Sequence, residues 1–465
     1  MSNNYNEKYV ESYEENDTPK GARAPIQLSD SFSYGRLLRF TMPSVLMMVF
    51  TSIYGVVDGL FVSNFVGKTP FAAINLIFPM IMVMAAVGFM LGTGGTAIVA
   101  KTLGMGDKAL ANKYFSFLVY VTIGAGVIIA TLGIVFAGPI ATMLGAEGEM
   151  HGYCVTYARI NMISLPFFML QNVFQSLFVT AEKPKIGLAV ILAAGCTNIV
   201  LDALFVAVFK WGLVGAACAT GLSQVVGGVI PLIYFSRPRQ CILRLGKTAF
   251  YGRMLGATCV NGSSELMSNI SSSVVTILYN YQLMRFAGEN GLAAYGAIMY
   301  VGFIFVAMFI GFVIGAAPVI GFHYGADNTT ELHSLLGKSL RIVGVAGAVM
   351  AALALVLSSP LAKLFVGYDE DLYRMTVRGF AIFAFHFLIC GFNIFGSAFF
   401  TALNNGAVSA VISFMRTLVF QCASVLLLPI FFGLDGVWFS IVVAELGAFA
   451  VTVTFLVAKR KKYRY

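Results

Sequence analysis

The sequence predicts an all-α membrane protein whose twelve transmembrane helices form two six-helix halves. The composition is 58% hydrophobic and 11% charged, with a mean hydropathy of +0.84, whereas a soluble domain carries about 25% charged residues. Apolar runs long enough to cross a bilayer recur along the whole chain. The two halves also repeat one another at a constant offset. Most of the chain is therefore expected to lie in lipid.

A helix needs about 20 predominantly apolar residues to cross the hydrocarbon core. The predicted spans of the first half are 37–66, 72–100, 114–137, 154–180, 186–209 and 213–235. Those of the second half are 255–286, 292–322, 337–366, 376–402, 407–432 and 435–458. Spans longer than the core is thick indicate tilt, kinks or ends that protrude into water.

Polar and basic segments predict the domain boundaries and the orientation. Residues 1–33 are polar, lack the apolar stretch of a signal peptide, and are predicted to be a disordered cytoplasmic tail. The basic connection 236–254 separates an N-lobe, residues 34–235, from a C-lobe, residues 255–458, and a basic tail follows at 459–465. Lys and Arg concentrate in these segments and in every second loop, which predicts that both termini are cytoplasmic.

Three local matches between the halves share an offset of 221 residues. Ala72-Ala73 matches Ala293-Ala294, Gly104 matches Gly325, and the Gly-Leu-Val-Gly of 212–215 matches the Gly-Leu-Asp-Gly of 433–436. Because each half has an even number of predicted spans, the repeats should run parallel about an axis along the membrane normal. Repeats of this kind place binding sites between the halves or within one half, near the bilayer midplane.

Four carboxylates lie inside the apolar runs: Asp58, Asp202, Glu265 and Glu445. A carboxylate at membrane depth is costly unless it is paired, hydrated or protonated, so such residues usually mark an ion or substrate path. Their recurrence in a chain with many spans predicts a transporter in which carboxylates exchange protons or small cations.

In the first half, two spans combine a carboxylate with another informative residue. Asn198 and Asp202 are four residues apart, hence on one helical face, and Thr220 follows on the next span. A hydrogen-bonded packing pair is the alternative interpretation. Pro43 shares the first span with Asp58, and a proline kinks a helix by removing a backbone hydrogen bond. Solvation of Asp58 in the outer headgroup region is the alternative there.

In the second half, Glu265 and Glu445 have less certain surroundings. Glu265 lies in an unusually polar stretch, residues 261–273, which indicates either a wet cavity wall or a helix partly in water. Glu445 lies midway along the last span, with Arg416 on the preceding one. A structural ion pair between them is the alternative to a transport role.

The sequence does not show the residue patterns that several other classes of function require. The four His and seven Cys show no zinc spacing and no CxxC pair, so neither a metal centre nor a disulfide framework is expected. Residues 92–95, Gly-Thr-Gly-Gly, lack the Gly-Lys-Ser/Thr element of a phosphate-binding loop. The net charge of +9 lies in loops beside the spans, which is typical of orientation and not of nucleic-acid binding. We therefore expect no enzyme, no cofactor and no nucleic-acid partner.

From about residue 35 to residue 458 the chain resembles the multidrug and toxic compound extrusion (MATE) family of bacterial and archaeal type. Pro43, Asp58, Asn198, Asp202 and Thr220 carry part of this resemblance. The rest lies in the motifs Leu103-Gly104-Met105-Gly106-Asp107, Glu182-Lys183-Pro184-Lys185, Tyr324-Gly325-Ala326-Asp327 and Gly433-Leu434-Asp435-Gly436-Val437-Trp438. Their order and spacing together are specific.

The resemblance implies a V-shaped pair of lobes around a central cavity, a functional monomer in the plasma membrane, and alternating access. It implies export of amphipathic, often cationic small molecules against H⁺ or Na⁺. Residues equivalent to Asp58, Asn198, Asp202 and Thr220 would bind the coupling cation, and the first helix would bend at Pro43. Some members hold Na⁺ in the C-lobe with a Glu like Glu265 and an acid in the tenth span, but residues 376–402 contain no acid here.

Two other functions fit the sequence less well. A flippase for lipid-linked saccharides, from the same broader superfamily, often has more spans and a basic cavity, whereas these spans hold almost no Lys or Arg. A receptor or membrane enzyme is disfavoured because the chain has no sizeable soluble domain and no nucleophile or metal constellation.

Overall fold

The computed structural model describes residues 26–237, 241–367 and 369–465, and this part of the chain is helical and contains no strand. The elements are α2 (Tyr34–Phe65), α3 (Lys68–Gly104), α4 (Lys108–Met143), α5 (Gly148–Thr180), α6 (Pro184–Asp202), the π-helix η1 (Ala203–Val208), α7 (Gly212–Ser236), α8 (Gly252–Gly325), α9 (Thr329–Val366), α10 (Glu370–Ala384), α11 (Phe387–Ala402), α12 (Gly406–Phe414), the π-helix η2 (Met415–Phe420) and α13 (Gln421–Tyr463).

The predicted all-α membrane fold is confirmed, whereas the count of twelve spans stays a prediction. Within the described ranges, nine helices are long and apolar enough to cross a membrane, or ten if α10 and α11, bent by 47°, make one span. At 74 residues, α8 is far longer than a bilayer is thick, and Gly288 interrupts it with φ 58° and ψ −145°. Gly433 interrupts α13 in the same way, with φ 56° and ψ −134°. Both breaks fall between two predicted spans.

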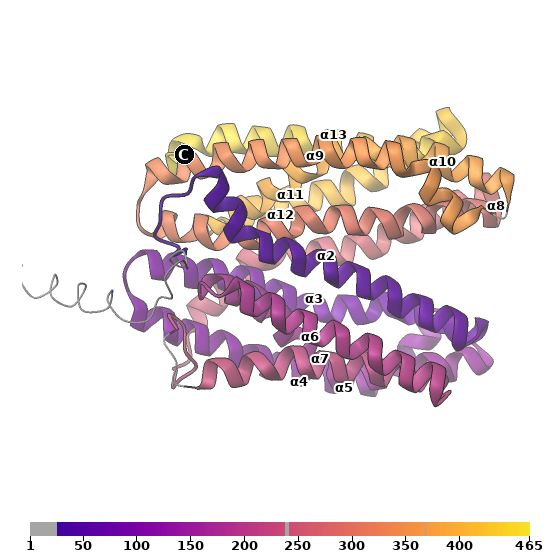
Figure 1. Cartoon of the computed structure of the whole chain (residues 1–465), viewed down its shortest axis with the longest axis horizontal. Helices are drawn as coiled ribbons and strands as arrows, with labels where there is room; N and C mark the ends of the chain where they lie inside the picture. Colours follow the sequence, from indigo (N-terminus) through magenta and orange to yellow (C-terminus); the bar gives the residue numbers. More distant parts are fainter. Residues whose placement is uncertain (1–25, 238–240, 368) are drawn as a thin grey trace, which may run out of the picture.

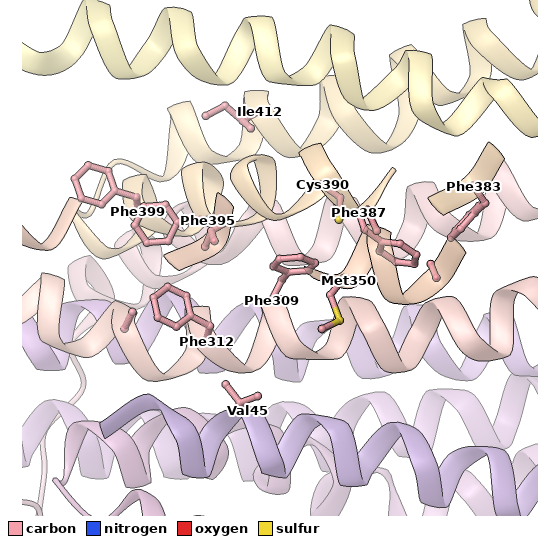
Figure 2. Packing of buried hydrophobic residues seen from close by; sticks show 14 of the residues in the cluster. Val45, Phe309, Phe312, Met350, Phe383, Phe387, Cys390, Phe395, Phe399 and Ile412 are labelled. Carbon is pink, nitrogen blue, oxygen red and sulfur yellow. The ribbon is translucent and has the colours of Figure 1, made fainter. Parts of the chain in front are cut away.

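The helices form two bundles that lie side by side (Figure 1), α2–α7 in one and α8–α13 in the other. One buried apolar cluster lies in the first bundle, and the other fills the second bundle and takes in Leu37, Phe40 and Val45 of α2. That of the second bundle is rich in Phe: Figure 2 shows Phe309 and Phe312 of α8 facing Phe387 and Phe395 of α11. We keep the names N-lobe and C-lobe for the two bundles.

Glycines bring α3 of the N-lobe and α8 of the C-lobe into backbone contact. A Cβ added to Gly104 would overlap the carbonyl oxygen of Phe322, and one added to Gly325 would overlap that of Lys101. Gly94 and Gly262 form a second reciprocal contact further along the same two helices. Small residues of this kind allow membrane helices to approach closely. We call this α3–α8 contact the inter-lobe seam.

The seam has a counterpart between α2 and α8. A Cβ on Gly315 would lie 2.8 Å from the Cα of Thr41. Gly315 and Gly94 are 221 residues apart, as are Gly262 and Thr41. The contact of Gly94 with Gly262 and that of Gly315 with Thr41 are thus the same contact made once in each direction, and the offset of the sequence repeat recurs in the packing between the lobes.

Residues 26–33, which precede α2, are packed against the helix ends. Leu28 and Phe32 are each 1% exposed, and Ser33 caps α2 by accepting a hydrogen bond from the Arg36 N–H. These contacts set residues 26–33 apart from the disordered tail that the sequence predicts over 1–33, of which residues 1–25 lie outside the described part. Beyond the predicted last span, α13 continues to Tyr463 and takes in most of the basic tail.

The connection between the lobes also packs closely. It runs between the end of α7 at Ser236 and the start of α8 at Gly252, slightly shorter than the predicted 236–254. Arg244 donates its backbone N–H to Asn112 of α4 across 2.6 Å, and Leu243 is fully buried. Residues 241–251 therefore lie along the end of the N-lobe.

Candidate functional site

A close crossing of α2 and α6 brings the predicted N-lobe residues together. Gly195 makes the crossing possible, because a Cβ there would lie 2.9 Å from the Tyr54 ring and collide with that of Phe50. Just beyond it, α2 carries Asp58 and α6 carries Asn198 and Asp202. Thr220 comes from the neighbouring helix α7. We call Asp58, Asn198, Asp202 and Thr220 the N-lobe cluster.

The side-chain oxygens of this cluster are buried and unpartnered. Asn198 is 1% exposed and Asp202 is fully buried. Within the described residues, no N–H or O–H donor reaches either carboxylate oxygen of Asp202, or Asp58 Oδ1, Asn198 Oδ1 or Thr220 Oγ1, and the carboxyls of Asp58 and Asp202 lie within hydrogen-bonding range of each other. More than nine in ten buried polar groups in proteins have a partner. The acceptors of Asp58 and Asp202, which lie side by side, therefore lack a partner that a bound proton or cation would supply.

The two carboxylates face each other without a fixed positive charge. Asp58 and Asp202 lie close enough to interact electrostatically, and neither forms an ion pair with any described Lys, Arg or His. Two ionised carboxylates in this position would repel each other strongly, because the local dielectric is low. A shared proton or a small cation would relieve that repulsion.

Two tyrosines of the site were not predicted from the sequence. Tyr157 of α5, 6% exposed, interacts electrostatically with both Asp58 and Asp202. Tyr54 of α2 interacts with Asp58 and with Gln171 of α5. A signal was available, because α5 carries an unusual series of buried polar side chains for a membrane helix: Asn161, Ser164, Gln171, Asn172 and Gln175.

Pro43 lies away from the cluster, in the first half of α2. The helix is continuous from Tyr34 to Phe65 with Pro43 inside it. The proline is buried between Thr41 and Val45, whose backbones are contacted by Gly315 and Gly311 of α8. Figure 2 shows Val45 on the side of α2 that faces α8. The predicted hinge therefore lies within the part of α2 that packs on α8, and its role in bending stays a prediction.

Glu445 has the structural ion pair that the sequence raised as an alternative. Its carboxylate is fully buried and accepts hydrogen bonds from Arg416 Nε at 2.8 Å and from Asn393 Nδ2 at 2.6 Å. His386 Nδ1 lies 3.7 Å from it. Thr452 donates to Asn393 Oδ1 at 3.0 Å, which orients the amide. This carboxylate is thus neutralised and fully hydrogen-bonded.

Glu265 lies on the polar stretch of α8 and is half-buried. It interacts electrostatically with Arg416. Arg416 lies in the π-helix η2, and short π-helical segments are frequent at functional sites. A fixed guanidinium beside Glu265 makes the C-lobe chemically unlike the N-lobe cluster, where the carboxylates have no cation of their own.

The N-lobe cluster suits a hard monovalent cation or a proton. Its ligands are carboxylate, amide and hydroxyl oxygens, which prefer hard cations. In the described part of the chain, no group of three or more His, Cys, Asp or Glu side chains is placed to hold a transition metal. Carboxylates at membrane depth also serve as proton relays in pumps and transporters.

The model of the MatE family matches residues 43–204 and 266–425 of this chain. The multidrug export protein MepA of Staphylococcus haemolyticus is 24% identical over 90% of this chain and 91% of its own length. MepA of Staphylococcus saprophyticus is 23% identical over 88% of this chain and 90% of its own length.

Solved structures share the fold. A MATE protein in complex with MaL6 has a TM-score of 0.88 and 22% identity, and the match covers 95% of this chain and 99% of that one. A MOP superfamily transporter from Pyrococcus furiosus, described as having a binding pocket of reverse polarity, has a TM-score of 0.86 and 22% identity, with 95% and 98% covered.

Proposed function

The chain belongs to the MatE family, and from that membership we propose that it is a secondary antiporter that exports amphipathic, cationic small molecules in exchange for H⁺ or Na⁺. Relatives of nearly the same length that carry the name multidrug export protein support the export function. In this proposal the coupling cation binds the N-lobe cluster, and no other cofactor takes part.

The observation that carries the proposal is the set of bare oxygens at Asp58, Asn198, Asp202 and Thr220. Protonation or Na⁺ binding there would neutralise the repulsion between Asp58 and Asp202 and supply the missing partners. When the cation leaves, the repulsion returns. The free energy of the cluster therefore depends on its occupancy, which coupled transport requires.

Alternating access is the second part of the proposal. α2 packs on α8 through Thr41 and Val45 and on α6 through Phe50 and Tyr54, so one helix contacts both lobes. Cation binding at Asp58, in the N-lobe half of α2, would bias the position of its C-lobe half. Bending at Pro43 would let the two halves move separately.

The remaining proposals concern the membrane. The protein would act as a monomer in the plasma membrane with twelve spans: α8 and α13 would each be divided, at Gly288 and Gly433, and α10 and α11 would together make one bent span. Both termini would be cytoplasmic, so the end of the bundles that holds residues 26–33 would face the cytoplasm. The bias of Lys and Arg supports this orientation.

Proteoliposomes loaded with a fluorescent lipophilic cation test the proposal. We expect an imposed pH gradient or Na⁺ gradient to drive dye movement against its concentration, and collapse of both gradients to stop it. The Asp202→Asn protein, reconstituted at equal density, is the matched control. Dye transport that persists without either gradient would exclude secondary antiport.

A further inference from the structure

Residues 26–33 contact both lobes at the end of the bundles where α2 begins and α13 ends. Leu28 donates its backbone N–H to Glu182 of the N-lobe at 2.6 Å. Phe32 donates its backbone N–H to Glu331 of the C-lobe at 2.9 Å. One short segment thus donates a hydrogen bond to a carboxylate of each lobe, and neither carboxylate belongs to the N-lobe cluster.

The attachment to the C-lobe is the stronger of the two. Besides Glu331, Lys338 of α9 donates to the Phe32 carbonyl, and His323 of α8 lies with its Nε2 3.3 Å from the Asp30 carbonyl. The Phe32 ring packs edge-to-face on His323, with ring centroids 6.4 Å apart. The segment also leads directly into α2, whose first half packs on α8.

The attachment to the N-lobe depends on fewer contacts. Glu182 lies between α5 and α6 and accepts the Leu28 N–H through one carboxylate oxygen. Burial raises the pKa of the Glu182 carboxyl above its ordinary value, so this acid is held partly out of water. Leu28 belongs to the same apolar cluster as Val179, which lies three residues before Glu182 on α5.

These contacts close the same end of the molecule as the inter-lobe seam. Gly104 and Gly325 are the last residues of α3 and α8, and their helices touch backbone to backbone there. Any movement that opens a path between the lobes at this end must separate these two helix ends. It must also detach residues 26–33 from one lobe.

We propose that residues 26–33 form a clasp that holds the two lobes together at the end where α2 begins and α13 ends, and that opens by releasing Glu182 while it stays bound to the C-lobe. This rests on the proposed alternating access. The clasp adds a separate stabilisation of the closed state, whose release is required once in each transport cycle.

Two cross-links distinguish the releasing contact from the permanent one. The pair Leu28→Cys and Glu182→Cys, in a Cys241→Ser background, is joined by a bifunctional methanethiosulfonate reagent that dithiothreitol removes. The background is needed because the Cys241 Sγ lies 4.0 Å from the Ala181 carbonyl. The matched control joins Phe32→Cys to Glu331→Cys in the same way.

We expect the cross-link between positions 28 and 182 to abolish dye transport, and dithiothreitol to restore it, which also shows that the protein is folded. The cross-link between positions 32 and 331 should leave transport near its uncross-linked rate. Normal transport with positions 28 and 182 joined would overturn the proposal, and so would a complete block by the control cross-link.

A second measurement does not depend on transport. In hydrogen–deuterium exchange of the purified protein, Glu182→Ala should speed exchange about tenfold at residues 98–106 and 320–327, the change that loss of a hydrogen bond to a charged group produces. Glu147→Ala, an exposed acid outside the clasp, is the control. Unchanged exchange at both helix ends would contradict the clasp, even if the uncross-linked protein showed no gradient-driven transport.

Discussion

Arg416 donates its Nε–H to the fully buried carboxylate of Glu445 across 2.8 Å. The Arg416 guanidinium is thus a fixed positive charge inside the C-lobe, balanced by Glu445. Removing one partner of a buried pair leaves an uncompensated charge and costs about 3–5 kcal/mol. We expect Arg416→Met to lower the melting temperature of the purified protein markedly. The double variant Arg416→Met with Glu445→Gln should recover much of the loss. Equal destabilisation in both variants would mean that packing, and not charge, dominates.

The N-lobe cluster should respond differently to the loss of a charge. Asp202→Asn keeps the size of the side chain and removes one of two repelling carboxylates, so we expect no loss of thermal stability. Coupled dye export should disappear, because Asp58 alone no longer faces a second carboxylate whose repulsion cation binding would relieve. Asn172→Asp, a new acid on the neighbouring helix α5, should not restore coupling. Normal export by Asp202→Asn at normal expression would refute the assignment.

Pro43 should affect the rate of transport and not substrate affinity. Pro43→Ala restores a backbone hydrogen bond to α2 and should stiffen it. We expect slower turnover with an unchanged dissociation constant for a fluorescent substrate. Pro79→Ala, in α3, is a comparable loss of a membrane-helix proline away from α2. An unchanged turnover for Pro43→Ala would remove the hinge role.

The inter-lobe seam should tolerate no side chain. Gly104→Ala places a Cβ on the carbonyl oxygen of Phe322, and overpacking of this kind costs about 1–3 kcal/mol. We expect faster hydrogen exchange at the ends of α3 and α8 and impaired transport. Gly124→Ala in α4, where no atom lies within 4 Å of the added Cβ, should instead stabilise its helix by about 0.5–1 kcal/mol. Similar behaviour of the two variants would show that the seam opens freely.

Substrate selectivity should favour lipophilic cations, because a desolvated cation gains from carboxylates and from aromatic faces. Cells that express the protein should tolerate ethidium-like dyes better than control cells do. The protection should fade when the proton and sodium gradients are both collapsed. Protection against anionic compounds alone would instead favour the flippase for lipid-linked saccharides.

The sequence predicts much of this fold because long apolar runs identify membrane helices. The limits of the predicted spans fall short at several ends, however. The predicted span 72–100 corresponds to α3, which extends from Lys68 to Gly104. Hydropathy identifies only the part of a helix that lies in lipid, whereas the helix itself continues to the next turn. The repeat offset of 221 residues, read from a few small residues, recurs in the contacts of Gly94 and Gly315 with the opposite lobe.

The candidate site was only partly predictable. Asp58 and Asp202 stand out because acids are rare in apolar runs, but Tyr157 is an ordinary residue until α5 is known to pass beside both. The role of Gly195 could not be predicted either, because it depends on the close approach of Phe50 and Tyr54 from another helix. The burial of Leu28 and Phe32 also depends on helix ends from both lobes, so the polarity of the segment around them did not predict it.

The positions of two contacts on α2 have a consequence for how the lobes move relative to each other. Its close backbone contacts with Gly315 and Gly311 of the C-lobe lie at Thr41 and Val45, and its contact with Gly195 of the N-lobe begins at Phe50, only about one and a half turns beyond Val45. A short helical stretch held at both ends transmits a displacement from one end to the other. A movement of either lobe would therefore be passed to the other across a single short stretch of α2, the helix that both lobes share.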